Sequence, residues 1–402
     1  MVATFMVKPS RDTNIRYITP LFKLCTLLCI IPPYDFRNYK FTICIKYRIY
    51  RALVLVFLLG GAVYCFISKV LYTFDMIQNT VVVVNVLAYI SFFLINVTSV
   101  TSANFNNFKS LDKFMNELVS IDRKLLAYHI TNKTKTSTWL WLEIFLNHVV
   151  LFFVMLFDGT LWYLASDNKF HFYMLYENLQ KYHTHILSHL MVNLIICLKH
   201  RYRIANNLLA EAVKQRDVVN ISTKILFKPY KDVYTVKNVI KIFIGLNRMI
   251  EYFNKIYGWT LLCIHINIIA SLLVSLDFII EFSSESNILR DKYGLEFILL
   301  MSMWSLMALC LGIFLASTAN STINEAQNTS NVSYKLLQYV PPSSTNPHDR
   351  ELREDLLLLS EQSSLRTPCF TAAGFFNVDY TMLFTLLSSI TSYLVVLIQF
   401  SN

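Results

Sequence analysis

Three histidines near the middle of the chain have a spacing that could bind a metal ion. His183, His185 and His189 lie close together, and a helix would place His185 and His189 on one face because they are four residues apart. Metal-dependent oxygenases of membranes use several such clusters, whereas the other six histidines here are scattered singly. We therefore expect a polar seam that faces other helices or a water-filled cavity, and no metal site.

Other catalytic signatures are missing from the sequence. It contains no paired carboxylates, nucleophile elbow, P-loop or dinucleotide fingerprint. Its eight cysteines form no CxxC pair, which predicts neither a disulfide framework nor a zinc site. We expect a protein that is not an enzyme and that holds no cofactor.

A second set of residues places charged, amide and aromatic groups inside strongly apolar stretches. Ionisable side chains within a membrane are costly unless they face a cavity or pair with one another. Aromatic rings with a few polar groups are typical of small-molecule pockets. Anchoring of the rings at the membrane surface and pairing between helices are the alternative roles. The pocket candidates are Asp158, Trp162, Tyr173, Tyr176, Glu177, Gln180, Asp277, Met303 and Trp304.

The last apolar stretch, Gly374 to Phe400, carries a polar stripe at helical spacing. Hydroxyl and amide groups recur there at steps of three or four residues, while leucine and isoleucine fill the other faces. Such a stripe in a membrane helix meets either protein or water, so helix packing and pore lining are both open. The stripe consists of Thr385, Ser388, Ser389, Ser392, Val396 and Gln399.

The elements that position these residues are membrane spans. The chain has 402 residues, of which 55% are hydrophobic and only 15% are charged, so a membrane must organise it. The sequence predicts an all-α integral membrane protein with seven transmembrane helices. The spans are expected near residues 52–68, 80–99, 139–165, 171–197, 257–281, 295–318 and 374–400.

These spans divide the chain into six parts. Residues 100–138 contain the amphipathic run FKSLDKFMNELVSIDRKLL, and the two long connections contain amphipathic helices that we expect to project into the cytoplasm. The parts are a cytoplasmic N-terminal segment (1–51), spans one to four (52–198), a cytoplasmic helical segment (199–256), spans five and six (257–318), further cytoplasmic helices (319–373) and the last span (374–402).

Basic residues decide the orientation. Of the 36 lysines and arginines, 31 fall in the segments that share one side with the N-terminus, and four fall in the opposite segments. The positive-inside rule therefore predicts a cytoplasmic N-terminus and an extracellular C-terminus, in a multi-pass protein of the plasma membrane. The net charge of +10 reflects this bias, and we expect no binding of nucleic acid.

The end of the chain resembles a known signature. The sequence SYLVVLIQF at 392–400 is similar to the TYhhhhhQF motif that ends the insect gustatory receptors: Tyr393, five apolar residues, Gln399 and Phe400 match in type and spacing. Ser392 stands where the motif usually has threonine and keeps the hydroxyl group. The length and the seven-span plan extend the similarity over essentially the whole chain.

The resemblance implies a ligand-gated, non-selective cation channel built as a tetramer, in which each subunit contributes its last helix to a central pore. The inner helices would form a cytoplasmic anchor, and the ligand would bind among the outer halves of spans two to six. Gln399 and Val396 fall where the family narrows its pore, which favours pore lining by the stripe. The expected pore-lining residues are Thr385, Ser389, Ser392, Val396 and Gln399.

The implied partners are a small-molecule tastant, cations in the pore, membrane lipid, and identical or related subunits in a homo- or hetero-tetramer. We favour a bitter tastant, although no residue decides this point. Two other functions stay open: an odorant receptor channel subunit, and a seven-helix receptor or transporter without a pore.

Overall fold

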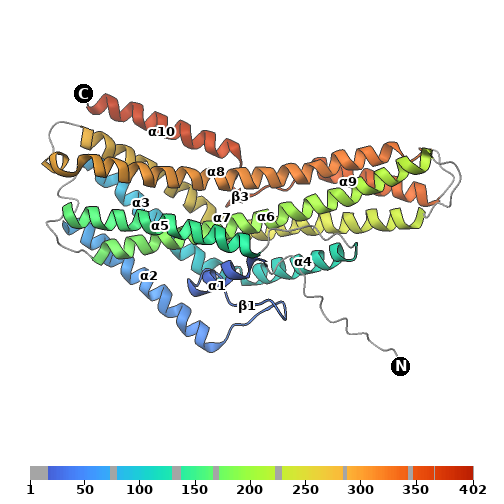
Figure 1. Ribbon diagram of the computed structural model, residues 1–402, viewed down its shortest axis with the longest axis horizontal. Helices are drawn as coiled ribbons and strands as arrows, with labels where there is room; N and C mark the ends of the chain where they lie inside the picture. The colour runs from blue at the N-terminus through green and yellow to red at the C-terminus, as the bar shows by residue number, and fades with distance from the viewer. Residues whose placement is uncertain are drawn as a thin grey trace.

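The computed structural model shows an elongated bundle of helices (Figure 1). It describes residues 17–72, 79–128, 137–165, 172–221, 229–283, 288–342, 347–365 and 367–401, so the predicted N-terminal segment lies partly outside the described residues. The helices are α1 (Thr19–Leu27), α2 (Ile45–Tyr72), α3 (Asn79–Thr101), α4 (Phe108–Leu126), α5 (Ser137–Ala165), α6 (Phe172–Ile221), α7 (Pro229–Ser283), α8 (Ile288–Gln338), α9 (Pro347–Leu365) and α10 (Tyr380–Ser401).

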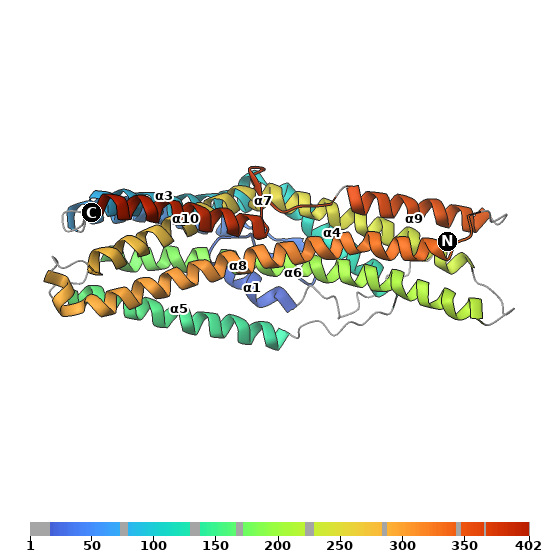
Figure 2. The ribbon, with the colours of Figure 1, turned by 90° about the horizontal axis from the view of Figure 1, so that it is seen from above.

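Each of the seven predicted spans corresponds to one helix, in the order α2, α3, α5, α6, α7, α8 and α10, although the last helix begins later than predicted. Successive helices of this set run in opposite directions (Figures 1 and 2). We call the outer end of the bundle the end where α2, α5, α7 and α10 finish and where α3, α6 and α8 begin. The inner end, where α6 and α8 finish and α7 begins, holds the connections predicted to be cytoplasmic.

Three helices run through almost the whole length of the molecule. α6, α7 and α8 have 50, 55 and 51 residues, and none contains a proline after its first residue that would break it. At a rise of 1.5 Å per residue α6 and α7 are at least about 75 Å long, and the part of α8 that follows a kink at Tyr293 (φ −140°, ψ 15°) is more than about 60 Å long, against a hydrocarbon core of about 30 Å. Each helix therefore crosses the membrane and continues well beyond it.

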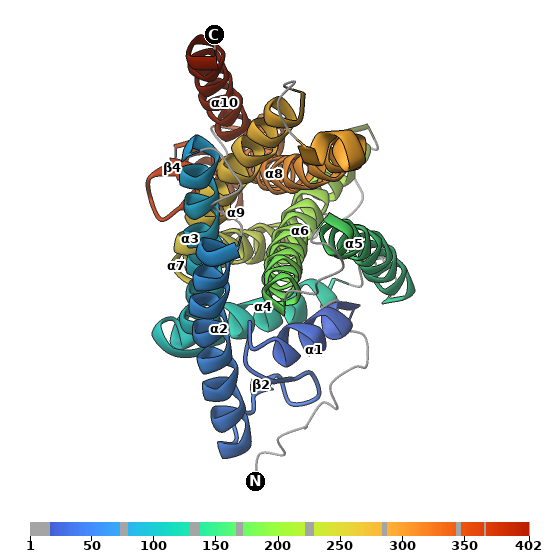
Figure 3. The same ribbon diagram turned by 90° about the vertical axis from the view of Figure 1, so that its left-hand side faces the viewer.

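Among the described residues, five helices are long and apolar enough to cross a membrane: α2, α3, α5, α7 and α8. In α10 the qualifying apolar stretch, Tyr380–Val395, is shorter. α6 does not qualify because its outer half carries charged and histidine side chains. It nevertheless packs against α2, α3, α5, α7 and α8, so its polar groups face protein (Figure 3).

The inner half is completed by two shorter helices. α4 coincides with the predicted amphipathic run, and its apolar face packs on the inner part of α7. A π-helical segment, Ser102–Asn106, joins α3 to α4. α9 packs against the inner parts of α7 and α8, which places the helices predicted from the two long connections side by side (Figure 2).

Four short strands form two hairpins: β1 (Tyr34–Asp35) with β2 (Lys40–Phe41), and β3 (Thr371–Ala372) with β4 (Phe376–Asn377). The second hairpin corrects the predicted start of the last span at Gly374, because the helix begins only at Tyr380. Gly374 has a φ of +82°, which suits a turn between the strands. Asp379 then accepts a hydrogen bond from the Thr381 N–H (2.8 Å), which satisfies a free donor at the start of α10.

One buried ion pair fixes α4 to α6 beyond the predicted fourth span. Arg201 donates through Nε and Nη2 to the two carboxylate oxygens of Asp122, at 2.8 and 2.9 Å, and through Nη1 to the Cys197 carbonyl at 2.7 Å. Burial alone would lower the pKa of Arg201, but the Asp122 carboxylate outweighs it and raises the pKa above its usual value. The pair is thus charged and fully satisfied.

Removal of one partner should therefore be costly. Asp122→Asn leaves a buried guanidinium without its counter-charge, and we expect a loss of about 3–5 kcal/mol in the stability of the inner half. The measurement is the thermal midpoint of the purified full chain in detergent. Glu351→Gln is the matched control, because Glu351 pairs with Lys237 at an exposed site and its loss should leave the midpoint almost unchanged. Equal midpoints for the two variants would contradict a structural role of the buried pair.

Candidate functional site

A cavity of about 180 Å³ lies in the outer half of the bundle, between α2, α3, α5, α6, α7 and α8. Its walls come from helix segments close to the outer end: Lys69 near the end of α2, Asp158 and Trp162 near the end of α5, and Tyr173 near the start of α6. A single water needs only about 10–15 Å³ by this measure, so the cavity has room for a small organic molecule.

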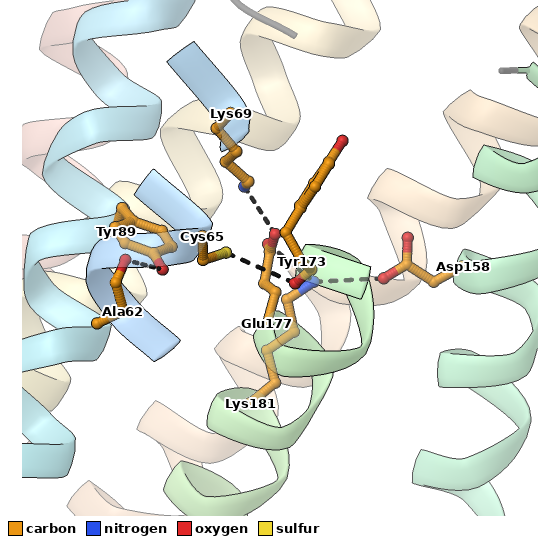
Figure 4. Close-up of polar contacts among 8 residues, drawn as sticks. All are labelled: Ala62, Cys65, Lys69, Tyr89, Asp158, Tyr173, Glu177 and Lys181. Carbon is orange, nitrogen blue, oxygen red and sulfur yellow. Dashed lines mark hydrogen bonds and ion pairs between the residues drawn. The ribbon is translucent and has the colours of Figure 1, made fainter. Parts of the chain in front are cut away.

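A chain of four charged side chains crosses one wall of this cavity (Figure 4). Lys69 Nζ lies 2.7 Å from Glu177 Oε2, Glu177 Oε1 lies 3.4 Å from Lys181 Nζ, and Lys181 Nζ lies 3.3 Å from Asp158 Oδ2. We call Lys69, Glu177, Lys181 and Asp158 the charge quartet. Its signs alternate and its net charge is zero, so every charge has an opposite neighbour in largely buried surroundings.

Local helix geometry explains how the quartet forms. Glu177 and Lys181 are four residues apart on α6 and share a face, and Asp158 on α5 and Lys69 on α2 approach that face from two sides. Aromatic rings cover both cations. Lys181 Nζ lies 4.2 Å from the centre of the Trp304 ring on α8, and Lys69 Nζ lies 5.6 Å from the centre of the Tyr89 ring on α3. The quartet therefore holds five helices around the cavity.

Neutral hydrogen bonds support the same arrangement. Tyr89 on α3 donates its hydroxyl to the Ala62 carbonyl on α2 at 3.1 Å, and Cys65 on α2 lies 3.5 Å from the Tyr173 carbonyl on α6. These contacts fix the position of Lys69 relative to Glu177.

The structure brings five of the nine predicted pocket residues together at the cavity: Asp158, Trp162, Tyr173, Glu177 and Trp304. The other four do not line it. Tyr176 donates to the Leu58 carbonyl, and its ring lies where a side chain on Gly61 would be. Gln180 donates to the Tyr176 hydroxyl at 3.3 Å.

Met303 and Asp277 point elsewhere. Met303 is 39% exposed on the outside of α8, one position before Trp304, because neighbouring helical residues diverge by about 100°. Asp277 is buried on α7 and faces α10. There, Tyr393 donates its hydroxyl to the carboxylate, at 3.0 and 3.2 Å from the two oxygens.

Several residues that line the cavity were not predicted from the sequence. Lys69 was expected in an outer connection, but α2 continues to Tyr72 and carries it into the wall. Lys181, Asn178 and Thr184 were not among the candidates. One signal could have found the two lysines. Asp158 and Glu177 lie inside predicted spans and need basic partners; Lys181 lies inside the fourth predicted span, and Lys69 directly follows the first.

The histidines form no metal centre in the described part of the chain, where no group of three histidine, cysteine or acidic side chains could hold a metal ion. His183 is buried, and His185 lies at the cavity. His148 on α5 instead pairs through Nε2 with the Tyr182 hydroxyl at 2.8 Å, which ties α5 to α6. The polar seam on α6 therefore faces other helices and the cavity.

The stripe on α10 is uncovered in the single chain. Thr385, Ser389 and Ser392 are exposed, and their hydroxyls donate to carbonyls of the same helix at 2.8–2.9 Å. Gln399 is exposed as well, whereas the side chains of Val396 and Phe400 lie outside the described residues. α10 packs on α7 and α8 through a neighbouring face of the helix, with Met382 and Leu386 buried.

Comparisons with known proteins agree with this architecture. The chain is 35% identical over 104 residues to putative gustatory receptor 28a and 30% identical over 107 residues to putative gustatory receptor 28b, both from Drosophila melanogaster. These stretches cover 26% and 27% of this chain and 21% of each relative, so the chain matches about a fifth of the relatives' length.

Among solved structures, the olfactory receptor OR5 from Machilis hrabei has the same fold, with a TM-score of 0.65 at 13% identity over 96% of this chain and 98% of that one. Its complex with eugenol gives a TM-score of 0.60 at 13% identity, over 96% of this chain and 100% of that one.

The resemblance to insect gustatory receptors is thus confirmed, and so is the helical membrane fold. A family model described as 7tm chemosensory receptor matches residues 15–402. The chain belongs to this family of chemosensory receptors, which are receptors and not enzymes.

Proposed function

We propose that this protein is a gustatory receptor that acts as a ligand-gated, non-selective cation channel of the plasma membrane. Two features support the proposal: a cavity with a charge quartet lies at the outer end, and the polar stripe of α10 remains uncovered. The cavity suits a small-molecule site, and the uncovered face of α10 suits a helix that assembles with the same helix of other subunits. Gustatory relatives favour a dissolved tastant, among which bitter compounds are our preferred class.

The pore would form from four copies of α10, in a homo-tetramer or together with related subunits. The stripe hydroxyls are already satisfied within the helix, so they need no protein partner and can face water. Val396 and Gln399 lie at the outer end of α10, where an apolar and amide ring would narrow the path. Cations are the permeating partner, and lipid would cover the apolar outer faces of α2 and α5.

α7 would connect the ligand to the pore. Its side chains Asn267, Ser271 and Val274 line the cavity, and Asp277, one position before the cavity residue Phe278, accepts the hydrogen bond from Tyr393 on α10. A ligand that binds the open arrangement more tightly than the closed one shifts the equilibrium between them. A shift of α7 would then reach α10 through this hydrogen bond.

The fold similarity over nearly the whole chain favours one other candidate, an odorant receptor channel subunit. The two functions differ in the ligand. Currents evoked by volatile compounds but not by dissolved, non-volatile tastants, in cells that express this chain, would favour the odorant receptor.

The first prediction concerns the pore. Gln399→Ala removes an amide from the expected constriction, and we expect a change of roughly threefold or more in relative cation permeability or open probability, with normal surface expression. Whole-cell recording with a panel of tastants is the measurement. Leu387→Ala is the matched control, because Leu387 is exposed on α10 but lies away from the stripe. Unaltered currents for Gln399→Ala would remove Gln399 from the pore.

The second prediction concerns coupling between α7 and α10. Tyr393→Phe removes the donor and Asp277→Leu removes the acceptor of the same hydrogen bond to a carboxylate, worth about 1.5–3 kcal/mol. Each should therefore shift the half-maximal ligand concentration by about tenfold or more, and the double variant should add little to either single variant.

Tyr380→Phe is the control for the second prediction. Tyr380 also donates from α10, but to Ser317 at an exposed site (3.3 Å), so its shift should be small. Fully additive effects of the two single variants would show that the hydrogen bond does not couple the helices.

A further inference from the structure

We propose that the cavity selects an uncharged ligand that carries a hydroxyl or amide group. This inference rests on the proposed function of the cavity as the ligand site and adds the chemical class of its ligand. It follows from two independent features of the walls, the charge balance of the quartet and the unpaired polar atoms beside it.

The charge balance disfavours an ionic ligand. Lys181 is shared between Asp158 and Glu177, and Glu177 is shared between Lys181 and Lys69, so no member of the quartet lacks a counter-charge. Their side chains are only 9–21% exposed. A cationic ligand would have to displace a lysine from its carboxylate, and an anionic ligand would have to displace a carboxylate from its lysine. Either exchange leaves a displaced charge unpaired in a poorly hydrated site, which is costly.

The second feature points to a hydrogen-bonding ligand. Within the part of the chain that the structure describes, three buried atoms of the cavity residues have no hydrogen-bond partner: Asn178 Oδ1, Thr184 Oγ1 and Trp304 Nε1. Thr184 is only 4% exposed. The three atoms are an acceptor, a hydroxyl that can donate or accept, and a donor. A buried polar atom without a partner is unfavourable, so a ligand that both donates and accepts would stabilise this wall.

The charge balance and the unpaired polar atoms are compatible at Trp304, because the ring face and the ring N–H make separate interactions. Its face contacts the Lys181 ammonium, which remains bound to the quartet, while its Nε1–H is unpaired. An uncharged hydroxyl or amide that binds beside these three residues would not have to break an ion pair. The rest of the ligand would contact aromatic and aliphatic side chains such as Phe92, Phe278 and Met301.

Cysteine modification tests this charge selection without a known agonist. Thr184→Cys places a thiol in the wall, and the purified full chain in detergent is treated with three methanethiosulfonates of similar size. One carries a trimethylammonium, one a sulfonate and one a hydroxyl group. Mass spectrometry gives the rate at residue 184, and each rate is divided by the rate of the same reagent at Cys44, which is exposed.

We expect the hydroxyl reagent to react at least about tenfold faster than either charged reagent after this correction. Two second-site variants should change the preference in opposite directions. Asp158→Asn leaves the quartet with a net positive charge and should accelerate the sulfonate reagent by about tenfold. Lys69→Met leaves a net negative charge and should accelerate the trimethylammonium reagent similarly. Lys181 and Glu177 still form an ion pair in both variants, so neither of these two central charges loses its counter-charge.

Four results would overturn the inference: equal corrected rates for the three reagents, faster reaction of a charged reagent in the chain with the intact quartet, a preference that neither second-site variant changes, and no labelling at residue 184. The first three leave the channel proposal standing, because they concern only which molecules enter. Conversely, the expected labelling pattern in a chain without ligand-gated current would contradict the channel and retain the charge selection.

Discussion

The requirement that charges buried in a membrane be paired explains most of the outer half of this molecule. Two acids and two lysines from α2, α5 and α6 lie in one alternating chain, and aromatic rings on α3 and α8 cover its cations. None of these helices could move far from the others without exposing a charge to lipid. The same requirement gives the cavity a wall that is polar and uncharged overall, so the interaction that holds the helices together also limits what can bind between them.

Continuous helices extend this arrangement across the membrane. α6, α7 and α8 pass without interruption by proline from the cavity into the inner half, where the Arg201–Asp122 pair fixes α4 to α6. A rotation or shift of one of these helices at the cavity would therefore be carried to the inner end. α10 begins near the middle of the bundle after its own hairpin, and it contacts α7 and α8 through one face only. It is therefore less restrained by its neighbours than α6, α7 or α8.

The sequence predicts the helices well because hydrophobic periodicity and charge bias are local signals. The seven spans, the amphipathic α4 and the helical connections are all found. The predicted ends of α2, which runs from Ile45 to Tyr72, and the predicted start of α10 were wrong; Gly374 and the β3–β4 hairpin interrupt an apolar stretch before α10. The site was harder to predict. Tyr173 and Tyr176 have the same residue type on the same helix, yet only Tyr173 lines the cavity, and that difference depends on how α2 packs against α6. Lys69 was missed because the end of α2 cannot be located from composition.

In the proposed orientation, the cavity lies at the extracellular end and the helical extensions lie in the cytoplasm. The most direct measurement places one epitope tag after Asn402 and, in a second protein, the same tag between residues 222 and 228, where α6 and α7 are connected. Both are stained in intact and permeabilised cells. We expect intact cells to label only for the C-terminal tag, whereas the internal tag should require permeabilisation. The reverse pattern would place the cavity in the cytoplasm and contradict both the orientation and the role of α10.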